Sequence, residues 1–304
     1  MRNFITAVVL GSLLISSPTV HAEIIAAKTM QDVQSTVESL LKNHKPEDIL
    51  VAFDIDMTLT QPNHSAVFYP ALRKYADLYK EILGKLPPVT KDLASTLTTQ
   101  ILPQKLVEKT TPKMIRQLEQ EGFKLIALTS SLAGHIHGYR DKMVVIRRDQ
   151  LQRMGIDFTK SFKNYCLVSA FQNFKPYAGY FPTFFHGILS TNGEKGASKG
   201  EVLVAFLKHV GPHREGKAYG SMGPGGGFYA KGVVMIDDKQ KHLEDIEAAV
   251  KEYDPSIQFI GIVYEGAYTY APQDISKEDF QKFWEGIAKQ AQRLSAYFKS
   301  KIVY

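Results

Sequence analysis

Cysteine is nearly absent from this chain of 304 residues, which contains only Cys166. One cysteine excludes an intrachain disulfide and a cysteine-rich zinc or iron–sulfur site, because those need at least two thiolates or histidines in their place. No internal repeat is visible, and 44% hydrophobic with 22% charged residues is a globular composition. The fold must therefore be stabilised by packing.

Blocks of basic residues are also lacking. Lys and Arg number 37 against 31 Asp and Glu, for a formal net charge of +6. The basic residues are nevertheless dispersed, as in the pair Arg147–Arg148, and aromatic residues do not alternate with them as they do in a groove for single-stranded nucleic acid. We expect a solvated basic surface and no specific nucleic-acid partner.

A hydrophobic run of the roughly 20 residues that span a bilayer is missing too. An apolar run begins at about Phe4, after the positive charge of Arg2, and is followed by Val20 and Ala22 at the −3 and −1 positions of a cleavage site. This order is typical of a secretory signal peptide. We expect residues 1–22 to be removed, the mature protein to be exported to the periplasm or secreted, and no membrane span to remain.

Continuous apolar runs predict buried strands near residues 48–53, 123–128, 233–236 and 257–264. Residues at helical spacing lie between these runs, and a capping box at 198–201 predicts the start of one helix. Strands that alternate with helices favour parallel pairing, so the expected class is α/β with right-handed crossovers. In such folds chemistry gathers beyond the carboxyl ends of the strands.

Residues 23–304 are expected to form one domain with two inserts. The first, at about 61–110, has an irregular helical pattern broken by prolines, and the second, at about 138–196, contains the aromatic stretch 177–185. That stretch either packs in the core or shapes substrate access. An apolar stripe over 280–298 predicts an amphipathic C-terminal helix that packs on the body of the domain.

Pairs of acidic residues follow two of the predicted strands: Asp54 and Asp56 come after the first, and Asp237 and Asp238 after the third. Ionised carboxylates beside a buried strand repel each other, so a bound cation or a raised pKa is the usual compensation. The alternative is that these side chains cap a turn and the start of the next helix.

Hydroxyl and cationic side chains occupy comparable places. Thr129 and Ser130 end the second predicted strand, and Lys199 lies in the first turn of the capped helix, where the helix dipole disfavours a lysine unless an anion is near. Taken singly, each is equally explained as a surface residue. Their order along the chain carries the information.

That order resembles the haloacid dehalogenase-like superfamily of hydrolases over about residues 50–264. The superfamily motifs correspond to Asp54-Ile-Asp56-Met-Thr58 for DxDxT, then Thr129, Lys199 and Asp237-Asp238. The C-terminal part of the match also resembles a DUF2608-type bacterial branch. Met57 departs from the pattern, because many members carry glycine there, and it either narrows the site or repacks the turn.

The resemblance implies a Rossmann-like three-layer sandwich with a mostly parallel central sheet and a helical cap-type insert. It implies a phosphatase, or else a phosphotransferase, acting on a phosphorylated small molecule, with Asp54 as the nucleophile that forms an aspartyl-phosphate and Asp56 as the acid and base. The implied ligands of Mg²⁺ are Asp54, the backbone carbonyl of Asp56 and Asp237, with Asp238 either a further ligand or a residue that supports one. The implied phosphate-binding residues are Thr129, Ser130 and Lys199.

The sequence contains two further candidate motifs and leaves one alternative function open. His135 and His137 have the spacing of a zinc half-site but lack an identified third ligand, and loop histidines are common. The glycine-rich segment 216–232 lacks the GxxxxGK[ST] order, which favours a surface loop or lid over an anion nest. The alternative function is a non-catalytic exported binding or host-interaction protein that retains the same fold.

Overall fold

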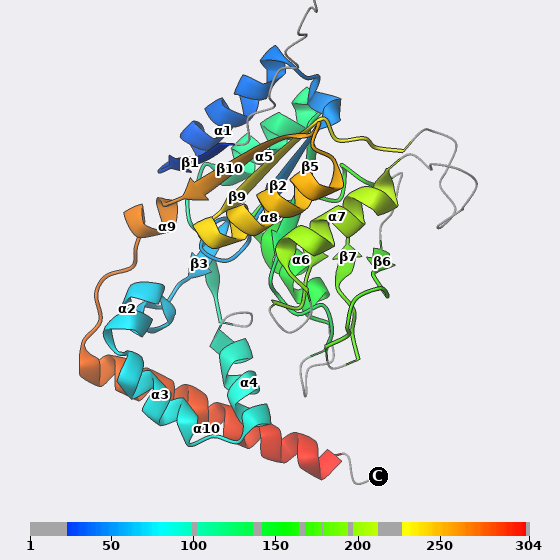
Figure 1. Cartoon of the computed structure of the whole chain (residues 1–304). Coiled ribbons are helices and arrows are strands. Elements are labelled where there is room, and N and C mark those ends of the chain that lie inside the picture. Colours follow the sequence, from blue (N-terminus) through cyan, green and yellow to red (C-terminus); the bar gives the residue numbers. More distant parts are fainter. Residues whose placement is uncertain are drawn as a thin grey trace, which may run out of the picture.

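An eight-stranded, mostly parallel sheet forms the centre of the fold (Figure 1). The structure is a computed structural model that describes residues 23–98, 102–135, 142–163, 168–177, 179–193, 197–211 and 227–301. The strands lie in the order β1-β10-β9-β2-β5-β8-β7-β6, parallel from β1 to β8 and antiparallel from there on. The expected α/β class is confirmed. The predicted signal peptide lies outside the described residues.

Four strands of the sheet fall on the four predicted apolar runs. These are β2 (Ile49–Phe53), β5 (Lys124–Thr129), β9 (Gly232–Asp237) and β10 (Gln258–Tyr264). The other sheet strands are β1 (Glu23–Ala27), β6 (Val168–Ala170), β7 (Thr183–Phe185) and β8 (Ile188–Ser190). β8 was not predicted, because three residues are too few to show a periodic pattern. β3 (Thr60–Pro62) and β4 (Gln104–Leu106) form a separate antiparallel pair.

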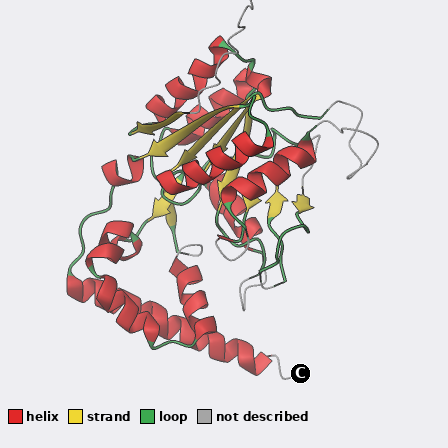
Figure 2. Cartoon of the chain, in the orientation of Figure 1, coloured by secondary structure: helices red, strands yellow, loops and turns green. Residues whose placement is uncertain are grey.

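Helices cover both faces of the sheet, as the buried strands require. α1 (Met30–Ser39), α5 (Thr111–Glu121) and α6 (Met143–Arg153) contribute to the core on one face. α7 (Lys199–Val210) and α8 (Gln240–Tyr253) contribute to the core on the other face. Figure 2 shows the sheet between these two sets of helices. Within the described part of the chain, no helix is long and apolar enough to cross a membrane.

A separate group of helices lies beside the sheet. It consists of α2 (Tyr69–Lys74), α3 (Ala76–Gly84), α4 (Pro88–Thr96) and the C-terminal α10 (Lys277–Lys301), and the short α9 (Gly266–Thr269) precedes α10. The apolar stripe of α10 packs against α3 and α4 (Figure 1) and forms a third core with them. The predicted amphipathic helix is present, and its buried face is covered mainly by α3 and α4, with Met143 of α6 in the same core. Its stripe specifies a buried face but not the surface that covers it.

Trp284 anchors α10 in this third core. Its side chain is buried, and its indole Nε1 donates to the carbonyl oxygen of Ala66 at 3.0 Å. The ring also packs edge-on against Tyr79 of α3, with 4.6 Å between ring centroids. The Trp284–Ala66 hydrogen bond joins residues 218 positions apart in sequence, next to α2, whose Tyr69 lies near Lys239 at the carboxyl edge of the sheet.

Candidate active site

Strand register brings two of the predicted acidic residues together. β2 lies next to β9, and Phe53 is paired with Ile236. The residues that follow these two along their strands are Asp54 and Asp237. The backbone N–H of Asp54 donates to the carbonyl oxygen of Ile236 at 2.8 Å. Parallel strands end at the same edge of a sheet, so these two carboxylates are forced to be neighbours.

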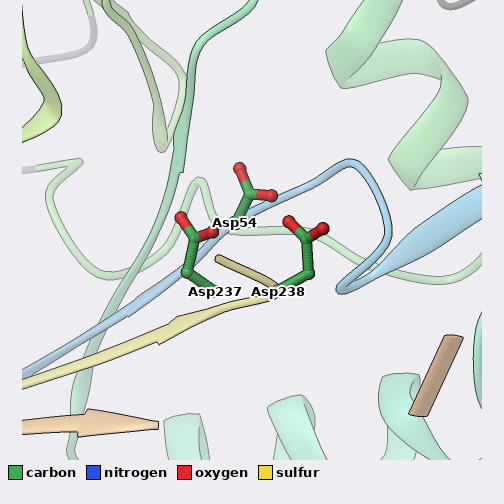
Figure 3. A group of neighbouring side chains, drawn as sticks. All are labelled: Asp54, Asp237 and Asp238. Carbon is green, nitrogen blue, oxygen red and sulfur yellow. The ribbon is translucent and has the colours of Figure 1, made fainter. Parts of the chain in front are cut away.

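Asp54, Asp237 and Asp238 form one cluster of carboxylates (Figure 3). One oxygen from each side chain lies within 4.8 Å of the other two, and Asp54 and Asp237 are buried. No other His, Cys, Asp or Glu side chains among the described residues form such a group of three. Carboxylate oxygens are the donors that hard divalent cations prefer, so this donor set fits Mg²⁺.

Lys199 lies between two of these carboxylates. Its ammonium nitrogen is 2.6 Å from Asp54 Oδ1 and 2.6 Å from Asp237 Oδ2, and the side chain is buried. The predicted capping box is present, since Ser198 Oγ accepts from the backbone N–H of Glu201 and the Glu201 carboxylate accepts from that of Ser198. The cap fixes the first turn of α7 and with it the position of Lys199.

Gly200 allows α7 to approach α8 closely. A Cβ atom at this position would lie 2.7 Å from the carbonyl oxygen of Asp245 and 2.8 Å from the Cβ of Ala249. The backbone N–H of Gly200 instead donates to the Asp245 carboxylate at 2.9 Å. Any larger residue would push the start of α7, and therefore Lys199, away from the carboxylates.

The pKa values of the cluster follow from burial and charge. Burial raises the pKa of Asp54 well above its usual value, against the effect of Lys199, and the neighbouring carboxylates raise it further. Burial disfavours the charged form of Lys199, but the attraction of Asp54 and Asp237 outweighs it and raises the lysine pKa. Lys199 is therefore a fixed positive charge at neutral pH.

The pKa values of Asp237 and Asp238 shift in opposite directions, although the two residues are adjacent. Burial opposes ionisation of Asp237, but the charge of Lys199 and the hydrogen bond from His242 outweigh it and lower the pKa to about 2. Burial and the charge of Asp237 raise the pKa of Asp238 to about 6. The difference arises because Lys199 contacts Asp237 directly, at 2.6 Å, whereas the pKa of Asp238 is governed by its burial and by the charge of Asp237.

His242 was not found by sequence reasoning. Its Nδ1 lies 3.1 Å from both oxygens of Asp237, one turn into α8. A histidine five residues after Asp237 is a weak signal, because its position depends on where α8 begins. In the structure it helps to orient the Asp237 carboxylate.

Asp56 lies outside the cluster of three carboxylates. Its side chain is 37% exposed, and its two oxygens are 2.5 and 2.6 Å from Nη2 of Arg147 on α6. The Arg147 side chain is only 1% exposed. No sequence pattern connects these two residues, since Arg147 stands out only as part of the basic pair Arg147–Arg148.

The two predicted hydroxyl residues differ in environment. Thr129 is fully buried, and its Oγ1 accepts from the backbone N–H of Ser131 at 3.1 Å. Ser130 is exposed. β5 ends at Thr129, so Ser130 is the first residue beyond the strand. Both residues lie at the carboxyl end of β5, which is parallel to β2, so they are at the same edge of the sheet as Asp54.

The turn after β2 has an unusual backbone conformation at Met57, where φ is +67°. This left-handed region favours glycine, which is the residue expected there from the resemblance. The Met57 side chain is 2% exposed and packs in the core, so the residue repacks the turn and does not narrow the site. The hydroxyl of the next residue, Thr58, is buried without a hydrogen-bond partner in the described structure.

Tyr69 of α2 is the contribution of the helical insert to this edge. Burial and the charges of four carboxylates, Asp238 and Asp56 foremost, raise its pKa. The phenol therefore stays protonated and can donate a hydrogen bond. Lys239 Nζ lies 5.5 Å from the centroid of its ring. Sequence reasoning missed Tyr69, because the insert pattern does not show which residues face the sheet.

The remaining candidate motifs give no second site among the described residues. The ring of His135 packs edge-on against Tyr180, with 5.6 Å between centroids, while His137 lies outside the described residues. Most of the glycine-rich segment, 216–226, is also outside them. In the aromatic stretch, Phe184 is a core residue.

Comparison with known proteins identifies the family. The chain matches the family described as a protein of unknown function, DUF2608, over residues 26–216 and 226–300, and it belongs to that family. A protein of Rickettsia bellii (strain RML369-C) is 24% identical over 264 residues, covering 83% of this chain and 80% of its own. One from Rickettsia felis (strain ATCC VR-1525 / URRWXCal2) is 25% identical over 274 residues, covering 86% and 83%. Both are described as uncharacterized proteins, and no solved structure matches.

These matches correct one part of the resemblance stated from the motifs. The DUF2608 part agrees with the family match. The assignment to the haloacid dehalogenase-like superfamily is not supported, because no family of that superfamily matches and DUF2608 does not itself point to it. Short motifs such as DxDxT are matched by few residues, so they carry less weight than a match along the chain.

Proposed function

We propose that this protein is an exported, Mg²⁺-dependent phosphomonoester hydrolase that acts through an aspartyl-phosphate on Asp54. One observation carries the proposal: a buried lysine contacts two buried carboxylates, Asp54 and Asp237, at the carboxyl edge of a parallel sheet, with Asp238 beside them. A Rossmann-like three-layer sandwich with a helical cap-type insert is part of the proposal. The helices on both faces of the sheet support it.

Asp54, Asp237 and Asp238 would hold Mg²⁺, together with the backbone carbonyl of Asp56. The ion supplies positive charge that allows a phosphate dianion to approach a group of carboxylates. Lys199 supplies one positive charge of its own, fixed between Asp54 and Asp237. Thr129, Ser130 and Lys199 would contact the phosphoryl oxygens, whose charge must be stabilised in the transition state.

Asp54 would act as the nucleophile. Its Oδ1 is bonded to Lys199, which orients the carboxylate and leaves the second oxygen to attack phosphorus. A bond forms between this oxygen and phosphorus, and the bond from phosphorus to the ester oxygen breaks. Asp56 would give a proton to the leaving oxygen and then take one from the water that releases phosphate and regenerates Asp54.

The test is turnover of p-nitrophenyl phosphate by the purified mature chain. We expect hydrolysis with Mg²⁺, loss of activity on exhaustive chelation, and recovery when Mg²⁺ is returned. Asp54→Asn should abolish turnover, because an amide is a poor nucleophile. Asp48→Asn is the matched control. Asp48 lies just before β2, at the end of the strand away from the site, and pairs with Lys231, so this variant should keep full activity.

Two outcomes would refute the proposal. Activity that survives chelation or the Asp54→Asn change would place the chemistry elsewhere. A folded chain that binds a phosphate monoester without turning over any of a panel would support the alternative, a non-catalytic exported binding or host-interaction protein.

A further inference from the structure

Arg147 is a buried cation that the proposed chemistry leaves unused. It lies on α6, where its helix neighbours Met143, Val144 and Leu151 are apolar core residues. A guanidinium is costly to bury without partners, and an apolar side chain would suit this position on the helix. The charge therefore calls for an explanation in terms of the groups that it contacts.

Each guanidinium nitrogen has a defined partner. Nη2 contacts both carboxylate oxygens of Asp56, at 2.5 and 2.6 Å. Nε donates to Ser131 Oγ at 3.2 Å, and Nη1 donates to Gln150 Oε1 at 3.3 Å. The planar guanidinium is thus held on two sides by neutral groups, while its third side faces Asp56.

The contacts continue to the end of β5. Ser131 Oγ is 3.0 Å from Thr129 Oγ1, and the backbone N–H of Ser131 donates to the same atom at 3.1 Å. Thr129, Ser131 and Arg147 are all buried. A buried chain of hydrogen bonds therefore runs from the sheet, which is rigid, to Asp56, which lies in a turn and is partly exposed.

We propose that Arg147 is a positioning residue that fixes the carboxylate of Asp56 for proton transfer. The inference rests on the proposed function, in which Asp56 serves the leaving group and the attacking water. A partly exposed aspartate on a turn has several rotamers, and proton transfer requires one of them within hydrogen-bond reach of the reacting oxygen. Arg147, aligned through Ser131 and Thr129, selects that rotamer.

The experiment compares Arg147→Gln and Arg147→Lys with wild type, in the mature chain with Mg²⁺. The probes are glycerol 2-phosphate, whose alkoxide needs a proton to leave, and p-nitrophenyl phosphate, whose leaving oxygen does not. For Arg147→Gln we expect kcat on the alkyl ester to fall at least about 10-fold with KM within about 3-fold. The pre-steady-state release of nitrophenol should change by less than about 3-fold. Arg147→Lys should lie between wild type and Arg147→Gln.

A double variant distinguishes positioning from a general structural effect. If Arg147 acts through Asp56, then Asp56→Asn combined with Arg147→Gln should be no slower than Asp56→Asn alone. Arg148→Gln is the matched control, because Arg148 is the next residue on α6, pairs with Asp149, and loses the same charge. Its kinetics should stay within about 2-fold of wild type, and circular dichroism should show every variant folded.

Each remaining outcome is decisive. If Arg147→Gln turns over both esters at the wild-type rate, the inference is overturned. It is also overturned if the rate of the double variant falls by the product of the factors measured for the two single variants. In either case the proposed function stands. If Arg147→Gln does not fold, Arg147→Lys decides: wild-type rates on both esters overturn the inference. A wild-type protein with no turnover refutes the proposed function and this inference with it.

Discussion

Replacement of Lys199 by methionine removes the ammonium group between Asp54 and Asp237 while keeping a side chain of similar length. At 2.6 Å and an effective dielectric constant of about 20, each of the two contacts has about 6 kcal/mol of Coulomb energy. Desolvation of the buried charges offsets most of this sum. Loss of one partner from a buried pair leaves the other charges uncompensated, so we expect the free energy of unfolding to fall by about 3–5 kcal/mol at neutral pH.

The loss of stability in Lys199→Met should be larger at neutral pH than at acidic pH. Without Lys199, the carboxylates have pKa values above those of the unfolded chain, so the folded variant binds more protons than the unfolded variant. Its stability therefore rises as the pH falls through those pKa values. The gap between wild type and Lys199→Met should narrow from about pH 7.5 to about pH 5.

Urea denaturation at both pH values measures the gap, and thermal melts give a second readout. For a chain of this size, the expected loss corresponds to a fall of roughly 10 °C in Tm at neutral pH. Mg²⁺ should raise the Tm of the variant more than that of wild type, because it returns positive charge to the carboxylates. Lys208→Met, an exposed position on the same helix, should change stability by less than about 1 kcal/mol.

Either of two results would contradict this role of Lys199. A folded Lys199→Met protein within about 1 kcal/mol of wild type at neutral pH would mean that the lysine does not balance the buried carboxylates. A deficit that stays constant between the two pH values would mean that the loss comes from packing.

Four further predictions follow from the site, the turn and the N-terminus. Asp238, with its pKa raised to about 6, should make Mg²⁺ affinity in calorimetry weaken below that pH, and Asp238→Asn should remove this dependence. Asp56→Asn should slow the turnover of alkyl phosphates most. With an aryl phosphate it should release a burst of the phenol and then stall as the phospho-enzyme accumulates; equal losses of rate on both esters would contradict the role of Asp56. Met57→Gly relieves about 1 kcal/mol of backbone strain but removes a buried side chain whose loss costs about 2–5 kcal/mol, so urea denaturation should show a lower free energy of unfolding. A variant more stable than wild type would mean that the backbone strain outweighs the packing of Met57. Intact mass should place the exported protein's first residue at Glu23; a chain that retains residues 1–22 would contradict export.

The main strands and the acidic part of the site could be predicted from the sequence. β2, β5, β9 and β10 are continuous apolar runs, because strands buried on both faces have no polar side. The acidic pairs stand directly after two of these runs, and parallel strands end at a common edge. The order of residues near each strand end is local, so it can be read without knowledge of the packing.

The hydrogen-bond partners of the site could not be predicted in this way. Arg147 and Asp56 are 91 residues apart, and their contact depends on how α6 packs on the sheet. Hydrophobic spacing identifies which face of a helix is buried, but it does not specify the rotation or shift that decides which polar side chains meet. The same limit applies to Tyr69, which approaches the carboxylates from the insert.

The sequence by itself thus determined the α/β class, the sites of the central strands and the presence of acidic residues at their ends, because these depend on local periodicity and on residue order. Tertiary structure alone decided the strand order β9-β2-β5, the separation of Asp56 from the other three carboxylates, and the packing of α10 on α3 and α4. Each of these depends on which surfaces pack together. An apolar stripe or a charged side chain shows that a partner is required, and only the packed chain shows which one it has.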